Sequence, residues 1–118
     1  MNKPSLAENE LSIRVLPAAS QSALAVNGRV TVDSSPRLRS ALLKLLRSNT
    51  QRVLVVDLSR VSYLDVSGIA TLVEALKVAH EQSVKLRLEG MSGQPRMIME
   101  VIEMDKILRE SESETILN

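Results

Sequence analysis

The sequence predicts one domain of the α/β class. Its 118 residues, 44% hydrophobic and 25% charged, suit a single compact unit. Alternating apolar residues, typical of half-exposed strands, are followed along the chain by segments whose apolar residues recur at helical spacing. Residues 53–56 are an uninterrupted run of valine and leucine, typical of a central strand covered on both faces. These patterns predict strands that alternate with helices, and hence parallel crossovers in one sheet.

Two strands are predicted near the start. Residues 1–10 are polar and without a period, and we expect them to be a flexible tail. Residues 11–15 then alternate apolar and polar side chains, and residues 24–32 continue the alternation until Asn27 and Gly28 interrupt it. On local chemistry the interruption favours a hairpin turn, and a bulge within one strand is the alternative.

The first helix is predicted to begin at Pro36. Asp33, Ser34 and Ser35 place capping residues before this proline, which is tolerated at the first helical position. On a helical projection the leucines gather in one arc and the basic residues occupy the remainder, so the basic run is mostly a solvated face. Leu43 alone falls among the polar residues, and we expect it to be exposed.

The second half of the chain is predicted to add one more crossover. The expected elements are a strand at 53–57 that ends in Asp57, a helix at 67–81, a strand at 84–89, a helix from Met97 to about Met104 and a short edge strand at 107–108. Strand, helix and strand in this order form a parallel unit. Residues 111–118 are expected to be a second tail or a short terminal helix.

The composition argues against several classes of protein. The chain has no cysteine, so it has no disulfides, thiolate metal sites or cysteine nucleophiles, and we expect a cytoplasmic protein. No apolar run is long enough to span a bilayer, so a role at a membrane would depend on a partner. Tyr63 is the single aromatic residue and no recognition motif is present, so nucleic-acid binding is not expected. We also expect no metal and no cofactor.

Catalysis is not expected either. The four glycines allow neither a GxGxxG nor a GxxxxGK[ST] phosphate-binding sequence. A serine hydrolase would need the single histidine, His80, next to the most exposed candidate serine, Ser67. On one helix these two residues would lie roughly 20 Å apart and point in different directions. We therefore expect no enzyme, and we expect His80 to be a half-buried structural residue.

Two aspartates and a serine are the candidate site residues. Asp57 and Asp65 flank the link before the second long helix, where a carboxylate commonly accepts backbone N–H groups. Ser67 lies in the first turn of that helix, and on the residues alone it too is best explained as a cap. Gly68 removes a Cβ beside its hydroxyl. The helical projection predicts an exposed face on which a partner docks, formed by Ser67, Ala70, Thr71, Glu74 and Val78.

The stretch VLVVDLSRVSYLDVSGIATLVEAL, residues 53–76, resembles the STAS domain, a family named for sulphate transporters and anti-sigma factor antagonists. The family pattern is a buried strand ending in Asp, a loop, and then Asp, a small residue, Ser, Gly and an amphipathic helix. Those positions are occupied here by Asp57, Asp65, Val66, Ser67 and Gly68. Weaker similarity extends over about residues 11–110, which we therefore expect to be the STAS domain.

The resemblance also implies an architecture. STAS domains have a mixed sheet of four to five strands with about four helices packed mainly on one face. By this analogy Asn27 and Gly28 form a bulge or kink inside one strand, which replaces the hairpin that local chemistry favours.

For function, the resemblance implies a bacterial regulator. In anti-sigma factor antagonists the matching serine is phosphorylated by a serine kinase that is itself the anti-sigma factor, and a phosphatase restores it. Ser67 is then the phospho-acceptor, Asp65 and Gly68 position it, and Asp57 supports the loop. Phosphate adds about −1.5 to −2 charge to the docking face and weakens docking.

A second function is compatible with the same resemblance. STAS domains also serve as cytoplasmic subunits of lipid-transporting ABC systems, where this face would bind an ATPase subunit without phosphorylation. Two departures from the family pattern bear on the choice. Val66 replaces the usual small residue and would hinder a kinase, and Glu103 and Met104 stand where glycine and leucine are common. The residues leave both partners open, and also a weak homodimer through a sheet edge or Leu43.

Overall fold

The computed structural model describes residues 11–17, 21–48 and 51–101. Four strands form one mixed sheet in the order β1-β2-β3-β4. The strands are β1 (Ser12–Pro17), β2 (Gln21–Val30), β3 (Val53–Leu64) and β4 (Lys85–Glu89). β1 pairs antiparallel with β2, whereas β2, β3 and β4 run parallel. The predicted α/β class with a mixed sheet is confirmed.

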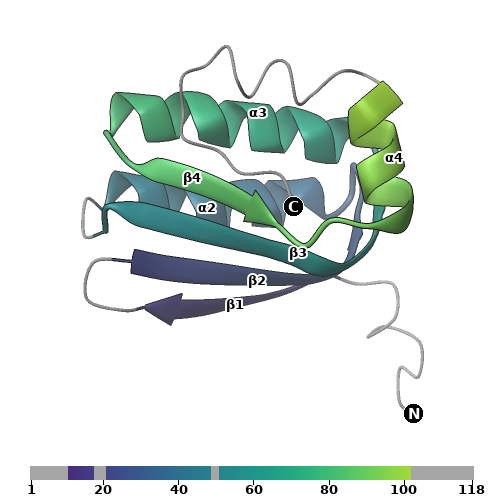
Figure 1. Ribbon diagram of the computed structural model, residues 1–118, viewed down its shortest axis with the longest axis horizontal. Coiled ribbons are helices and arrows are strands. Elements are labelled where there is room, and N and C mark those ends of the chain that lie inside the picture. The colour runs from purple at the N-terminus through teal and green to yellow at the C-terminus, as the bar shows by residue number, and fades with distance from the viewer. Residues whose placement is uncertain (1–10, 18–20, 49–50, 102–118) are drawn as a thin grey trace.

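Three helices complete the described part of the fold. α2 (Ser35–Arg47) and α3 (Val66–Glu81) lie side by side on one face of the sheet, and α4 (Gly93–Val101) lies near the end of the sheet (Figure 1). Buried leucines from the strands and from α2 and α3 fill the space between the two layers. The predicted tails and the predicted strand at 107–108 lie outside the described residues.

A kink within β2 replaces the hairpin that local chemistry favours. Asn27 and Gly28 lie inside this one strand, and the register with β3 shifts on either side of them. Gly28 has a φ of 116°, a backbone conformation that residues with a Cβ rarely adopt. The bulge implied by the family resemblance is therefore confirmed.

β3 is longer than predicted, and this corrects the expected end at Asp57. The strand continues to Leu64 because β2 continues beyond its bulge and supplies a pairing partner, with Asn27 opposite Arg60 and Val30 opposite Leu64. The polar residues between Asp57 and Leu64, which we expected to lie in a loop, occupy the exposed positions of this second part of β3. Asp57 consequently lies in the middle of a strand.

The burial of two side chains on α2 and α3 differs from the expectations. Leu43, predicted to be exposed, is buried in the core cluster because α3 covers that side of α2. An Arg39–Glu74 ion pair joins the two helices, with N–O distances of 2.6 and 2.8 Å. His80, predicted to be half-buried, is exposed near the end of α3.

Candidate functional site

The candidate site lies where the parallel strands end. The carboxyl ends of β2 at Val30 and of β3 at Leu64 are paired neighbours, and α2 and α3 begin just beyond them. The N–H of Asp65 donates to the carbonyl of Val30 at 3.1 Å, which fixes the start of α3 beside the loop before α2. Loops and helix N-termini converge at this edge of a parallel sheet, which makes it a common place for a functional site.

Asp65 holds this junction together. As the N-cap of α3, its Oδ1 accepts hydrogen bonds from the Ser67 hydroxyl at 2.5 Å and from the Gly68 N–H at 3.1 Å. Its Oδ2 accepts from the N–H of Val32 at 3.0 Å. The capping role predicted for Asp65 is confirmed. The same carboxylate also ties the tip of α3 to the loop before α2, a contact that sequence spacing does not reveal.

These contacts keep Asp65 ionised. Burial disfavours the charged form, but hydrogen bonds from the Ser67 side chain and from the N–H groups of Gly68 and Val32 outweigh it, so the pKa of Asp65 lies below its ordinary value. A fixed negative charge therefore sits beside the Ser67 oxygen at neutral pH.

Ser67 occupies the first turn of α3 and is half-buried. Its hydroxyl donates to Asp65, and its carbonyl accepts from the Thr71 hydroxyl at 3.0 Å. The oxygen thus lies in a polar junction and not inside the hydrocarbon core. A group added to it would gain from the partial positive charge of the helix N-terminus but would meet the Asp65 carboxylate directly.

Gly68 is required for packing. A Cβ at this position would lie 2.5 Å from Leu64 Cδ1 and 2.7 Å from Val30 Cγ1. The first turn of α3 therefore rests directly on the ends of β2 and β3, and a larger residue would fit only if the helix or these side chains shifted. We expected Gly68 to uncover the serine hydroxyl, whereas the hydrogen that replaces its side chain faces the core.

α4 supports the junction from beside β3. The Gln94 side chain donates from Nε2 to the Leu64 carbonyl at 2.9 Å, and its Oε1 accepts from the Leu64 N–H at 2.8 Å. One side chain thus satisfies both backbone groups of the last residue of β3, as a neighbouring strand would. No sequence signal pointed to this residue.

The predicted docking face of α3 is wrong in its orientation. Thr71 and Val78 are only 7% and 6% exposed, and Glu74 is half-buried and paired with Arg39. This stripe, which begins at Ser67, faces α2 because small and polar side chains allow the two helices to pack closely. The exposed or half-exposed stripe consists instead of Val66, Ala70, Val73 and Lys77, of which only Ala70 was on the predicted face.

Two exposed valines flank Ser67. Val66 is 70% exposed and Val32 is 68% exposed, and the Val32 N–H binds the same carboxylate as Ser67. Large apolar side chains on a surface commonly mark a contact site when they cluster near polar groups. Val32 lies 35 residues before Ser67 in the sequence, so only the fold brings the two together.

A family model described as "Mlab, STAS domain" matches residues 14–110 of the chain. The chain belongs to the STAS domain family. The site just described coincides with the Asp65, Ser67 and Gly68 positions on which the resemblance rested.

Solved structures share the fold of this STAS domain. An anti-sigma factor antagonist from Mycobacterium paratuberculosis has a TM-score of 0.71 and 19% identity, with 82% of this chain and 81% of that chain covered. The Bacillus cell fate determinant SpoIIAA in its phosphorylated form has a TM-score of 0.66, 9% identity and 91% of each chain covered. At these identities the likeness establishes the fold alone.

The same fold occurs inside a much larger protein. The murine Solute Carrier 26 family member A9 anion transporter has a TM-score of 0.65 and 14% identity, with 95% of this chain but only 21% of that chain covered. Among the residues described for this STAS domain, no helix has the length and apolarity to span a membrane. Nor do the described residues include a group of three or more potential metal ligands.

In this STAS domain Asp57 lies far from Ser67. It pairs with Ala25 and Glu89 in the middle of the sheet, and its carboxylate accepts from the Ser59 N–H at 2.9 Å. Hydrogen bonds from Ser59 lower the pKa of Asp57. Seven residues of strand lie between it and Asp65, roughly 25 Å of extended chain. The structure therefore gives Asp57 no contact with Ser67 or Asp65 through which to support the loop.

Proposed function

We propose that this STAS domain is an anti-sigma factor antagonist. It binds a serine-kinase anti-sigma factor while Ser67 is unphosphorylated, it is released when Ser67 is phosphorylated, and a phosphatase restores it. The observation that carries the proposal is the Ser67 hydroxyl, which is held by Asp65 at the start of α3 between two exposed valines. The existence of SpoIIAA structures in unphosphorylated and phosphorylated forms supports a switch of this kind in a similar fold.

The unphosphorylated surface is suited to docking. Val32, Val66 and Ala70 offer exposed apolar contacts around a hydroxyl whose hydrogen already has an acceptor in Asp65. Burial of these side chains against a partner is favourable because they lose contact with water. Thr71 and Val78, which we expected to touch the partner, are replaced in this proposal by residues of the exposed stripe.

Phosphorylation changes both the charge and the local geometry. Transfer of the γ-phosphoryl group of ATP to Ser67 Oγ replaces the hydroxyl proton and releases ADP and that proton, so Ser67 can no longer donate to Asp65. A phosphate group with about −1.5 to −2 charge then faces an ionised carboxylate. Repulsion between the two anions disturbs the Asp65–Val32 contact, and the hydrated phosphate opposes burial of the valines.

Mass measurement and binding test the proposal together. The purified protein is incubated with ATP and each serine-kinase anti-sigma factor of the source organism, and intact mass and fragment spectra are recorded. We expect one added phosphate on Ser67 and none in Ser67→Ala. In a binding assay Ser67→Asp should no longer bind the kinase. Ser92→Asp, on an exposed serine of the loop before α4, should still bind it. No phosphate on Ser67, with Ser67→Asp still bound, contradicts the proposal.

A second candidate function uses the same surface without phosphorylation. The 70% exposed Val66 stands next to Ser67 and favours permanent docking over access by a kinase. In this case the domain is a subunit of a lipid-transporting ABC complex and its exposed valines pack on the ATPase subunit. Ser67→Ala is then silent, Val66→Asp abolishes assembly, and an ATPase and a permease purify with the protein. Loss of the complex in Ser67→Ala but not in Val66→Asp contradicts this function.

A further inference from the structure

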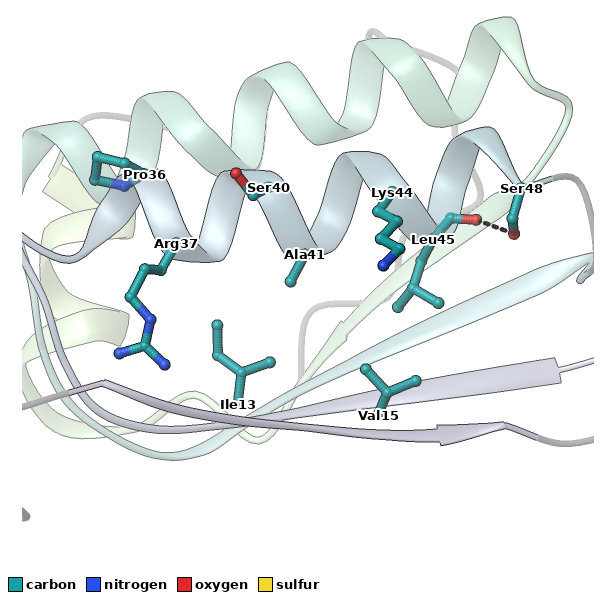
Figure 2. Close-up of a pocket in the computed structure, with 9 residues that line it drawn as sticks. All are labelled: Ile13, Val15, Pro36, Arg37, Ser40, Ala41, Lys44, Leu45 and Ser48. Atoms are coloured by element: carbon teal, nitrogen blue, oxygen red, sulfur yellow. Dashed lines mark hydrogen bonds between the residues drawn. The ribbon is translucent and has the colours of Figure 1, made fainter.

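An open groove runs between β1 and α2, away from the Ser67 junction. Its volume is about 880 Å³, and Figure 2 shows Ile13 and Val15 rising from β1 toward α2 along its length. On the α2 side it is lined by Ala41 and Leu45, together with Pro36, Arg37, Ser40, Lys44 and Ser48. Val15 is 44% exposed at its floor. α2 and α3 pack against each other, and among the described residues no other helix lies above the edge strand β1.

The shape of the groove fits a helix better than a strand. Its lining residues on α2 recur at spacings of three and four, so they form one stripe along almost the full length of that helix. Both β1 residues in the groove point to the helical layer, where Ile13 and Val15 pair with the core-facing Val26 and Leu24. An occupant therefore lies beside α2 and above β1, in the same layer as α2 and α3.

The charges of the groove select the occupant. Arg37 and Lys44 lie on its rim, and no carboxylate is among its lining residues. Arg37 donates to the Leu11 carbonyl at 2.8 Å, so it is held at one end of the groove. A second copy of this chain that used the same groove would bring these positive charges together, which is unfavourable. Carboxylates on the occupant would be attracted.

We propose that the β1–α2 groove binds an amphipathic, acidic helix of a partner protein. An aliphatic stripe of that helix packs on Ile13, Val15, Ala41 and Leu45, and glutamate or aspartate side chains on its flanks face Arg37 and Lys44. This is recognition of a helix by an apolar groove with charges that set its orientation. The inference does not depend on phosphorylation of Ser67.

Binding of designed peptides to the full chain tests the proposal. The probe is a capped, helix-forming peptide of about 15 residues, with leucines at i, i+4 and i+7 spacing and glutamates on both flanks. One control peptide carries lysine for glutamate, and another has the probe's composition in an order without helical period. Binding is followed by fluorescence anisotropy and mapped by amide chemical shifts in ¹⁵N-labelled protein. We expect the probe alone to bind and the shifts to fall on β1 and α2.

Two pairs of protein variants locate the contact. Lys44→Glu should weaken binding about tenfold or more, whereas Lys77→Glu, on the exposed face of α3, should not. Val15→Asp should abolish binding, whereas Leu16→Asp should not, because Leu16 is 48% exposed but lies on the opposite face of the same strand. Equal thermal unfolding temperatures within each pair show that the fold is retained.

Several outcomes would overturn the proposal. These are no binding of the probe, equal binding of the aperiodic peptide, shifts confined to other surfaces, or equal effects within either variant pair. A dimer that forms on concentration without peptide and is lost in Val15→Asp shows instead that a second copy fills the groove. Sedimentation equilibrium of the free protein and of this variant separates that case.

Discussion

The hydroxyl of Ser67 and the carboxylate of Asp65 are joined by a hydrogen bond of 2.5 Å. The same carboxylate caps α3 and holds the loop before α2. The proposed phospho-acceptor is therefore part of the structural support of the junction, and chemistry at its oxygen has structural consequences.

Replacement of the cap should destabilise the domain. Asp65→Ala removes the acceptor for Gly68 and Val32, and we expect the free energy of unfolding to fall by about 1–2 kcal/mol. Asp65→Asn, which keeps an oxygen acceptor, should lose less. Urea unfolding followed by circular dichroism measures both. An unchanged midpoint in Asp65→Ala would show that the cap does not stabilise the fold.

The contribution of Asp65 should depend on pH in one direction. Because its pKa is lower in the folded protein than in the unfolded chain, its ionised form stabilises the fold. That stabilisation is fully present above about pH 4, the ordinary aspartate value, and is lost as the pH falls through the lower folded-state pKa. The stability difference between the natural protein and Asp65→Asn should therefore shrink on acidification. Urea titrations from neutral pH downward test this, and a difference that grows below that value contradicts it.

Gly68→Ala should strain the start of α3. Its new Cβ would come within 2.5 Å of Leu64 Cδ1, so either the helix or the leucine must move. We expect a loss of about 1–3 kcal/mol, typical of overpacking. Gly93→Ala is the control for the steric effect, because nothing lies within 4 Å of a Cβ at that position. Its φ of 60° adds a separate backbone cost. If the clash is the cause, the loss in Gly68→Ala,Leu64→Ala should be smaller than the sum of the losses in the two single variants, because Leu64→Ala alone already removes a buried side chain.

Gln94 should be more important than a surface glutamine. Gln94→Ala leaves both backbone groups of Leu64 without this partner, and we expect a loss of about 1–3 kcal/mol. Gln94→Glu should be comparably harmful at neutral pH, because a carboxylate cannot donate to the Leu64 carbonyl. Gln21→Ala, on an exposed position of β2, serves as the control. Slower amide exchange at Leu64 in the natural protein than in Gln94→Ala would show the contact directly.

The order of the elements could be predicted because each has a local cause. Pro36 marks the start of α2, where Ser34 is the N-cap by position but makes no side-chain cap hydrogen bond, and the apolar run at 53–56 marks β3. The length of β3 could not be predicted, because its last residues are strand only by pairing with β2 beyond the Gly28 bulge. Ser59, Arg60 and Ser62 interrupt the apolar residues of this segment, and pairing with β2 makes it a strand nonetheless.

The residues of the candidate site could be predicted, but the exposed surface around them could not. Asp65, Ser67 and Gly68 follow from local spacing and from the family pattern. The exposed stripe of α3 did not follow, because a helical projection assumes one buried face. α3 has two, one against the sheet and one against α2. Val32 and Gln94 reach the junction only through the fold.

α2 begins at the junction that Asp65 secures and then runs for 13 residues, about 20 Å, along the β1 groove. It is a rigid rod with one end beside the serine and one flank beside the groove. A ligand in the groove that displaced this rod would alter the surroundings of the serine, and linkage would then require phosphorylation of the serine to alter affinity in the groove. Through such reciprocity, one small domain would respond jointly to binding in the groove and to modification of the serine.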